Sequence, residues 1–127
     1  MNKKHTNKLY KDFPTLYRGR HKTIQESCMP WGVCCGNGWF DLIYKLSQYI
    51  TTLDKKVEAT QVKEKFGGLR FYISSASRQV HDLVEKAGED SYHICEECGK
   101  EGKLRTDIGW HLTLCEEHHK KHKKESK

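Results

Sequence analysis

Near the carboxyl end of the chain, Cys95 and Cys98 are separated by two residues, and Cys115 and His118 repeat that spacing after sixteen intervening residues. A Cys-x2-Cys turn lets two thiolates reach one ion while later main-chain amides hydrogen-bond to the sulfurs. Gly99, directly after Cys98, fits a tight turn of this kind. Zinc takes four soft or borderline ligands in a tetrahedron, so we expect these four residues to bind one Zn²⁺. Since no position is left for water, the ion should be structural rather than catalytic.

The second pair of candidate ligands is predicted to begin a helix. Thr113 followed three residues later by Glu116 is the pattern of a capping box, which places Cys115 and His118 on one face of the first turn. The amino end of a helix also favours the thiolate of Cys115. His119 is the alternative fourth ligand because it too lies one turn from Cys115. We prefer His118 because its two-residue gap matches that of the first pair.

The order of these pieces indicates the fold of the carboxyl-terminal third. A knuckle, a short hairpin from Leu104 to Leu112 and a helix that supplies two ligands resemble the treble-clef arrangement of zinc fingers. A domain this small and polar gains folding free energy from a bound metal. Removal of the zinc is therefore expected to unfold this third.

Composition sets the remaining bounds. The chain has 127 residues, of which 35% are hydrophobic, which suits one small domain and is too short for two. No run approaches the roughly 20 apolar residues of a membrane span, and the first residues lack the apolar segment of a secretory signal. We therefore expect a cytoplasmic protein with no membrane partner, whose six cysteines favour metal binding over disulfides. A net charge of +6 permits an anionic partner.

Four segments are expected along the chain. Residues 1–27 form a basic amino-terminal arm that docks partially on the domain, and residues 28–92 form the core. Residues 93–122 form the zinc finger, packed on that core, and residues 123–127 form a basic tail. The predicted fold class is α+β: an amphipathic helix packed on a β-ribbon, then a second helix, then the treble-clef-like finger.

Two amphipathic helices are predicted in the core. From Trp39 to Leu53 apolar residues recur at intervals of three and four, with Asn37 as the expected cap. The second helix begins near Ser77, and Gly88 is expected to end it.

The segment between the helices is predicted to form two strands around a Gly67-Gly68 turn. Phe66 then opposes Leu69, and the strands present one apolar face that should lie on the long helix. Glu64 is the charged member of that face. It either pairs with a buried cation or indicates a different register.

The other face of the ribbon is predicted to be polar. Hydrogen-bond donors beside an aromatic ring suit phosphate or nucleic acid, so this face is a candidate anion-binding or nucleic-acid-binding site. The alternative is a solvated sheet face whose lysines prevent aggregation. The residues of this face are Gln61, Lys63, Lys65, Arg70 and Tyr72.

A glycine-rich loop before the long helix holds further candidates. Trp31 and Trp39 are candidate partner-binding residues, since exposed tryptophans anchor interfaces, although both could instead be core. The same stretch carries three more cysteines, Cys28, Cys34 and Cys35. They could bind a second metal with His21, be small buried thiols, or have a redox or nucleophilic role.

Three stretches of the chain together resemble a family of small, largely uncharacterised phage and prophage proteins. These stretches are CMPWGVCCGNGWFDLIYKLSQYI, QVKEKFGGLRFYI and CEECGKEGKLRTDIGWHLTLCEEH, and the likeness covers roughly residues 10–118. The family pairs a GWFDLI helix and a KEKFGGLRFY ribbon with a carboxyl-terminal zinc finger. The resemblance implies a phage source and the cytoplasm of a bacterial host. Small accessory phage proteins often bind host machinery, so it also implies a counter-defence inhibitor.

Three functions are compatible with these features. The first is a non-enzymatic module that binds a host protein or nucleoprotein. The second is a nucleic-acid-binding protein that uses the polar ribbon face and the basic segments. The third is a sponge for a small anionic nucleotide signal, held by Lys63, Lys65 and Arg70. An enzyme is not expected, because paired metal-binding carboxylates, a phosphate loop and the deaminase pattern are missing; a metal-dependent nuclease with scattered acids is the alternative.

Overall fold

The core is built on a three-stranded sheet in the computed structural model, which describes residues 1–125. β1 (Val33–Cys34) pairs in parallel with β2 (Ala59–Lys65), and β2 pairs antiparallel with β3 (Gly68–Ile73). The sheet order is β1-β2-β3, so β3 is an edge strand. β1 lies in the stretch that the sequence predicted to be an irregular loop, because two residues are too few to show strand periodicity.

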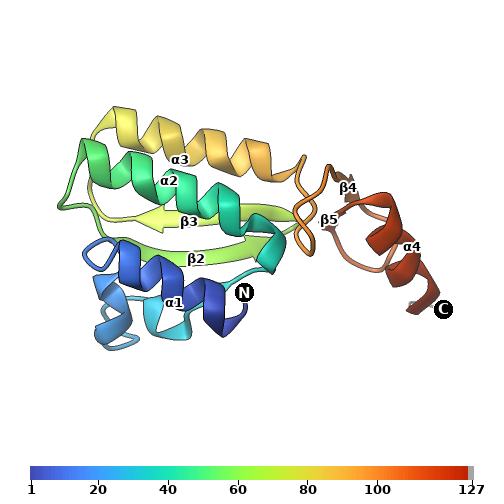
Figure 1. The fold of residues 1–127 in the computed structure, drawn as a ribbon, viewed down its shortest axis with the longest axis horizontal. Coiled ribbons are helices and arrows are strands. Elements are labelled where there is room, and N and C mark those ends of the chain that lie inside the picture. Colours follow the sequence, from blue (N-terminus) through green and yellow to red (C-terminus); the bar gives the residue numbers. More distant parts are fainter. Residues whose placement is uncertain (126–127) are drawn as a thin grey trace.

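Three helices run along the sheet. α2 (Phe40–Leu53) lies between α1 (Lys3–Asp12) and α3 (Arg78–Ser91), as Figure 1 shows. Phe13, the residue directly after α1, packs on Tyr44 of α2, with ring centroids 4.9 Å apart. Both predicted core helices therefore form where the apolar periodicity placed them.

The amino-terminal segment is part of the core. Residues 1–27, predicted as a partially docked arm, contain α1 and a short 3-10 helix, Arg18–His21. Leu9, Leu16 and Tyr17 are almost completely buried. The hydroxyl of Tyr17 shares a 2.7 Å hydrogen bond with that of Ser47 on α2. This segment thus contributes apolar side chains as well as positive charge.

A buried carboxylate fastens the amino-terminal segment to the sheet. Glu58 is buried, and its Oε1 lies 3.1 Å from Arg18 Nε and 2.8 Å from Lys22 Nζ. The Arg18 guanidinium also donates to the carbonyl of Lys56 at 2.8 Å. Two of the basic residues in this segment are therefore neutralised by the core.

The predicted helix boundaries need two corrections. Asn37 does not cap α2: it begins a short 3-10 helix (Asn37–Trp39), and its side-chain oxygen accepts from the Asn2 amide. Gly88 does not end α3, which continues to Ser91. Gly88 instead faces β3, since a Cβ there would meet the Leu69 carbonyl at 3.5 Å. α3 begins near Ser77 as predicted, and Ser77 is its cap, with its hydroxyl accepting from Val80 N–H.

The hairpin register differs from the prediction by two residues. Glu64 pairs with Leu69 and Lys65 pairs with Gly68, so the two-residue turn consists of Phe66 and Gly67. Both turn residues have positive φ, 54° and 86°, as a type I′ turn requires. Because a two-residue shift preserves the alternation of side chains, the predicted faces hold and Val62, Leu69 and Phe71 face the core.

Glu64 remains on the apolar face at the end of β2. Its carboxylate accepts the Gly67 N–H at 2.7 Å, so it bonds to the turn instead of pairing with a buried cation. The charge lies at the hairpin end, beside a main-chain donor, and this explains how the apolar face tolerates it.

The carboxyl-terminal third lies at one end of the sheet, beyond the β2–β3 turn (Figure 1). It consists of a two-stranded sheet, β4 (Lys103–Arg105) and β5 (Leu112–Leu114), followed by α4 (Glu116–Glu125). Residues 126–127 of the predicted basic tail lie outside the described residues. Within residues 1–125, no helix has both the length and the apolar character needed to cross a membrane.

Candidate metal centre

The knuckle at 95–98 is a tight turn closed by main-chain hydrogen bonds. The Gly99 N–H donates to the Cys95 carbonyl at 2.9 Å, and the Cys95 N–H donates to the Lys100 carbonyl at 2.7 Å. Gly99 adopts φ 81°, a left-handed conformation that glycine accepts at no steric cost. The thiol of Cys98 accepts from the Lys100 amide. This is the pattern of amide-to-sulfur bonds expected of a metal-binding knuckle.

Cys115 lies between β5 and α4, directly before the first helical residue. The predicted capping box does not form, because the hydroxyl of Thr113 donates to the Gly67 carbonyl at 2.7 Å. The sulfur of Cys115 accepts the N–H of His118 instead, three residues on. A cysteine sulfur therefore takes the place of the expected threonine cap.

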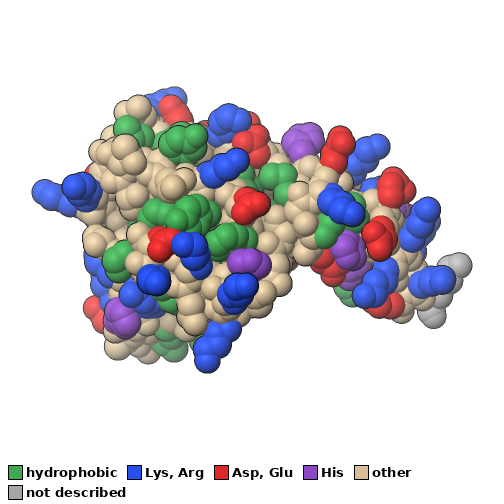
Figure 2. Space-filling model, in the orientation of Figure 1, with side chains coloured by type: hydrophobic (Ala, Val, Ile, Leu, Met, Phe, Trp, Pro, Cys, Tyr) green, Lys and Arg blue, Asp and Glu red, His purple; other side chains and the backbone are tan. Residues whose placement is uncertain are grey.

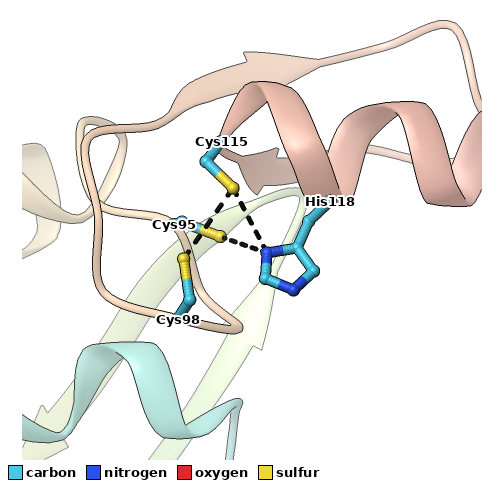
Figure 3. A group of neighbouring side chains, drawn as sticks. All are labelled: Cys95, Cys98, Cys115 and His118. Atoms are coloured by element: carbon cyan, nitrogen blue, oxygen red, sulfur yellow. Dashed lines mark hydrogen bonds between the residues drawn. The ribbon is translucent and has the colours of Figure 1, made fainter.

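The four predicted ligands converge on one point (Figure 3). Their ligand atoms all lie within 4.8 Å of one another. Cys115 Sγ is 3.2 Å from His118 Nδ1 and 3.8 Å from Cys98 Sγ, and Cys95 Sγ is 3.6 Å from the same ring nitrogen. Three sulfurs and one imidazole nitrogen arranged in this way could hold a metal ion.

The structure distinguishes between the two candidate histidines. His118 directs Nδ1 at the thiols, and its Nε2 faces the Glu97 carboxylate at 3.6 Å. His119 points away from the cluster, with its Nε2 2.8 Å from Asp107 Oδ1. His118 is therefore the histidine that completes the four-residue cluster.

The thiols differ in acidity. Burial raises the pKa of Cys98 to about 11. Burial acts in the same direction on Cys115, but hydrogen bonds from the backbone and ring of His118 outweigh it and lower the pKa to about 7. Of these two thiols, Cys115 is the better prepared to bind a cation near neutral pH.

The glycine-rich loop at 36–38 holds the knuckle against the core by hydrogen bonds. Gly36 N–H donates to a Glu96 carboxylate oxygen at 2.8 Å, and Gly38 N–H donates to the Glu96 carbonyl at 2.6 Å. A Cβ at Gly38 would clash with the Cys95 carbonyl. The indole N–H of Trp39 donates to the Ile94 carbonyl at 2.8 Å. The loop can be recognised in the sequence but this role cannot, since the contacts span about 60 positions of the chain.

The two candidate partner-binding tryptophans have opposite environments. Trp31 is 68% exposed, whereas Trp39 is completely buried. Trp39 is therefore corrected from a candidate anchor to a core residue, because its ring fills the core and its N–H is bonded to the knuckle.

The remaining cysteines lie apart from the cluster. Among residues 1–125, Cys28, Cys34, Cys35 and His21 form no metal-binding group, so the possible second site is not supported. Cys35 is buried, and burial raises its pKa to about 12, as suits a small core thiol. Cys34 is exposed and Cys28 is half-buried.

The polar ribbon face forms as predicted. Gln61 pairs with Tyr72 and Lys63 pairs with Arg70, and Lys65 follows on the same face. These side chains range from half-buried to exposed. Tyr92 joins them: its ring lies where a Cβ of Gly68 would otherwise be, and its hydroxyl is 3.4 Å from the Arg70 guanidinium. The sequence held no signal for Tyr92, because the crossing of α3 over β3 places it there.

None of the protein families, curated proteins or solved structures compared with the chain matches it.

Proposed function

We propose that this protein is a non-enzymatic, zinc-stabilised binding module, and that it acts as a phage accessory protein on a host protein or nucleoprotein. Three features support this function: the chemistry of the Cys/His cluster, the exposed apolar side chains on two hairpins, and the resemblance of the sequence to phage proteins.

Zinc is the metal that the donor set favours. Three thiolates with one imidazole are typical of structural zinc sites, and softer or harder metals prefer other ligand sets. Four protein ligands leave no coordination position for water, which supports a structural rather than a catalytic ion. The order of knuckle, β4–β5 hairpin and α4 supports a treble-clef-like finger.

The observation that carries the proposal is the exposure of large apolar side chains on two hairpins that contact each other. Phe66 is 65% exposed at the tip of the β2–β3 hairpin, and Trp110 is 59% exposed between β4 and β5. The two hairpins touch at Gly67, where Leu104 packs against the turn and Thr113 donates to the carbonyl. We name Phe66, Leu104 and Trp110 the hairpin-tip surface.

The metal centre gives this surface a fixed shape. Cys95 and Cys98 precede the β4–β5 hairpin and Cys115 directly follows it, so one ion would tie both ends of the hairpin together. Large aromatic side chains held rigidly at a surface are the usual anchors of protein interfaces. The hairpin-tip surface therefore fits a protein partner, and the resemblance to phage proteins favours a host protein and a counter-defence role.

Affinity capture from a bacterial lysate tests this proposal. The tagged protein should retain a specific partner that resists nuclease treatment. Phe66→Ala and Trp110→Ala should each reduce the retained amount, whereas Tyr49→Ala, which removes an exposed aromatic from α2, should not. Capture that is equal for all three variants would exclude the hairpin-tip surface. Capture that disappears with nuclease would replace the protein partner with nucleic acid.

A further inference from the structure

The sheet has a second surface on the side away from the buried apolar face. Alternation along β2 and β3 directs Val62 and Phe71 to the core and directs Lys63, Arg70 and Tyr72 the other way. Lys63 and Arg70 are direct cross-strand partners, and Lys65 lies two residues along on the same face. We name Gln61, Lys63, Lys65, Arg70, Tyr72 and Tyr92 the open sheet face.

Among the described residues, the basic side chains of the open sheet face take part in no ion pair. Within residues 1–125, no carboxylate oxygen lies within 4.0 Å of Lys63, Lys65 or Arg70. Like charges directly opposite each other destabilise a sheet. By contrast, the basic residues Arg18 and Lys22 are both paired with Glu58. The open sheet face is thus a concentrated positive surface that an anion would stabilise.

Aromatic rings lie among these charges, beside two hollows. Tyr72 is 44% exposed and lines both hollows. One, of about 530 Å³, lies between β3 and α3 and is also lined by Arg70, Tyr92 and Glu85. The other, of about 520 Å³, lies toward residues 24–28 and includes Gln61. Each hollow has room for a planar base beside the Tyr72 ring.

We propose that the open sheet face binds single-stranded nucleic acid. Lys63, Lys65 and Arg70 would contact successive phosphates, and Tyr72 and Tyr92 would stack on unpaired bases. Carboxylates and a histidine on α3 line the first hollow and supply hydrogen bonds to base edges or sugar hydroxyls. A duplex keeps its bases stacked inside and cannot use the rings. This inference does not depend on the protein partner proposed above, since it uses a different surface.

Fluorescence anisotropy with labelled oligonucleotides of about 12 nucleotides tests the inference directly. Oligo(dT) and oligo(U) are titrated with the full chain between about 50 and 200 mM salt. Lys63→Gln should lower the slope of log affinity against log salt by about 0.7, the loss of one phosphate contact to a single strand. Tyr72→Ala should weaken binding about 10-fold and leave that slope unchanged.

Two matched variants on α2 serve as controls. Lys45→Gln and Tyr49→Ala remove an exposed lysine and an exposed tyrosine away from the sheet, and both should bind as the parent does. Circular dichroism checks that every variant is folded. Preference for DNA or RNA would identify the kind of strand.

Three results would overturn the inference. The first is no binding at the lowest salt. The second is equal loss in the α2 controls. The third is an affinity for a duplex or for a mononucleotide that equals the affinity for the single strand. Equal affinity for the mononucleotide would favour a nucleotide-signal site. Trp110→Ala should leave oligonucleotide binding unchanged, so failure here is distinguishable from failure of the protein-partner proposal.

Discussion

Glu97 lies inside the knuckle sequence, and its carboxylate contacts two histidines of α4. Its oxygens are 3.6 Å from His118 Nε2 and 3.2 Å from His122 Nε2. A carboxylate on the outer nitrogen of a ligand histidine fixes the ring and its tautomer, so that Nδ1 faces the metal. We therefore expect Glu97 to be a positioning residue for His118.

Glu97→Ala should weaken metal binding by about 10-fold to 100-fold. Competition against a chromophoric zinc chelator measures the affinity. Glu117→Ala removes a neighbouring exposed carboxylate and should leave the affinity unchanged. Equal affinity for Glu97→Ala and the parent would mean that the carboxylate does not orient the ring.

Asp12 makes stability depend on pH. Its Oδ2 accepts from Lys8 Nζ at 2.7 Å and from the Tyr44 hydroxyl at 2.5 Å. The hydrogen bond from Lys8, followed by that from Tyr44, lowers the pKa of Asp12 below its ordinary value. A carboxyl with a lower pKa in the folded state stabilises the fold above the unfolded pKa, and this contribution is lost as the pH falls through the folded pKa.

Asp12→Asn should therefore destabilise the protein at about pH 7, and the difference should shrink below about pH 3.9. Urea unfolding of both proteins at each pH measures this difference in the free energy of unfolding. Both proteins contain the same Cys/His cluster, so the pH dependence of the cluster cancels in the comparison. A difference that is equal or larger in acid would contradict the assigned role of Asp12.

At the scale of elements, the loop at 36–38 and the knuckle must approach each other without side chains between them. A Cβ at Gly38 would clash with the Cys95 carbonyl, which is main chain and cannot move aside cheaply. Gly38→Ala should destabilise the protein by about 2 kcal/mol, the range of a forced overpacking. Thermal unfolding of the metal-loaded protein measures this loss, and an unchanged midpoint would show that the knuckle is not held by this loop.

At Gly88, within α3, we expect a substitution by alanine to stabilise the protein. Its Cβ position meets the Leu69 carbonyl at 3.5 Å, an ordinary contact, and glycine weakens a helix interior. Gly88→Ala should raise the free energy of unfolding by up to about 1 kcal/mol. Chemical denaturation measures it, and a lower stability would mean that α3 and β3 are packed too closely for a methyl group.

Local patterns predicted the elements, and long-range contacts decided their details. The apolar periodicity of α2 and α3 located both helices, because each buries one stripe. The hairpin turn was displaced because its sequence, Phe66-Gly67-Gly68, permits two turns. Glycine is required at position 68 because the Tyr92 ring occupies the place of a Cβ there. The Glu64 carboxylate accepts a hydrogen bond from the Gly67 amide. The turn therefore consists of Phe66 and Gly67, and Phe66 adopts a positive φ. The Tyr92 contact joins distant positions of the chain, so the pattern around the turn gives no sign of it, whereas Glu64 is only three residues from Gly67.

At the scale of the whole molecule, the metal centre is the junction between the core and the carboxyl-terminal third. The four candidate ligands were predictable because their spacing is local and repeated. The contacts that hold the cluster against the core could not be predicted. They come from the loop at 36–38, Trp39 and the hairpin turn at Gly67, which lie in distant parts of the chain. Metal removal should therefore loosen β4, β5 and α4 while α1, α2 and the three-stranded sheet persist.

The metal content of three purified proteins tests the central claim most directly: the parent, His118→Ala and His119→Ala. The structure directs His118 at three thiols and His119 at Asp107. The parent and His119→Ala should each hold one equivalent of zinc by elemental analysis, and His118→Ala should bind it far more weakly and lose it to a mild chelator. A parent without bound metal, or a His119→Ala protein that loses zinc while His118→Ala retains it, would contradict the account.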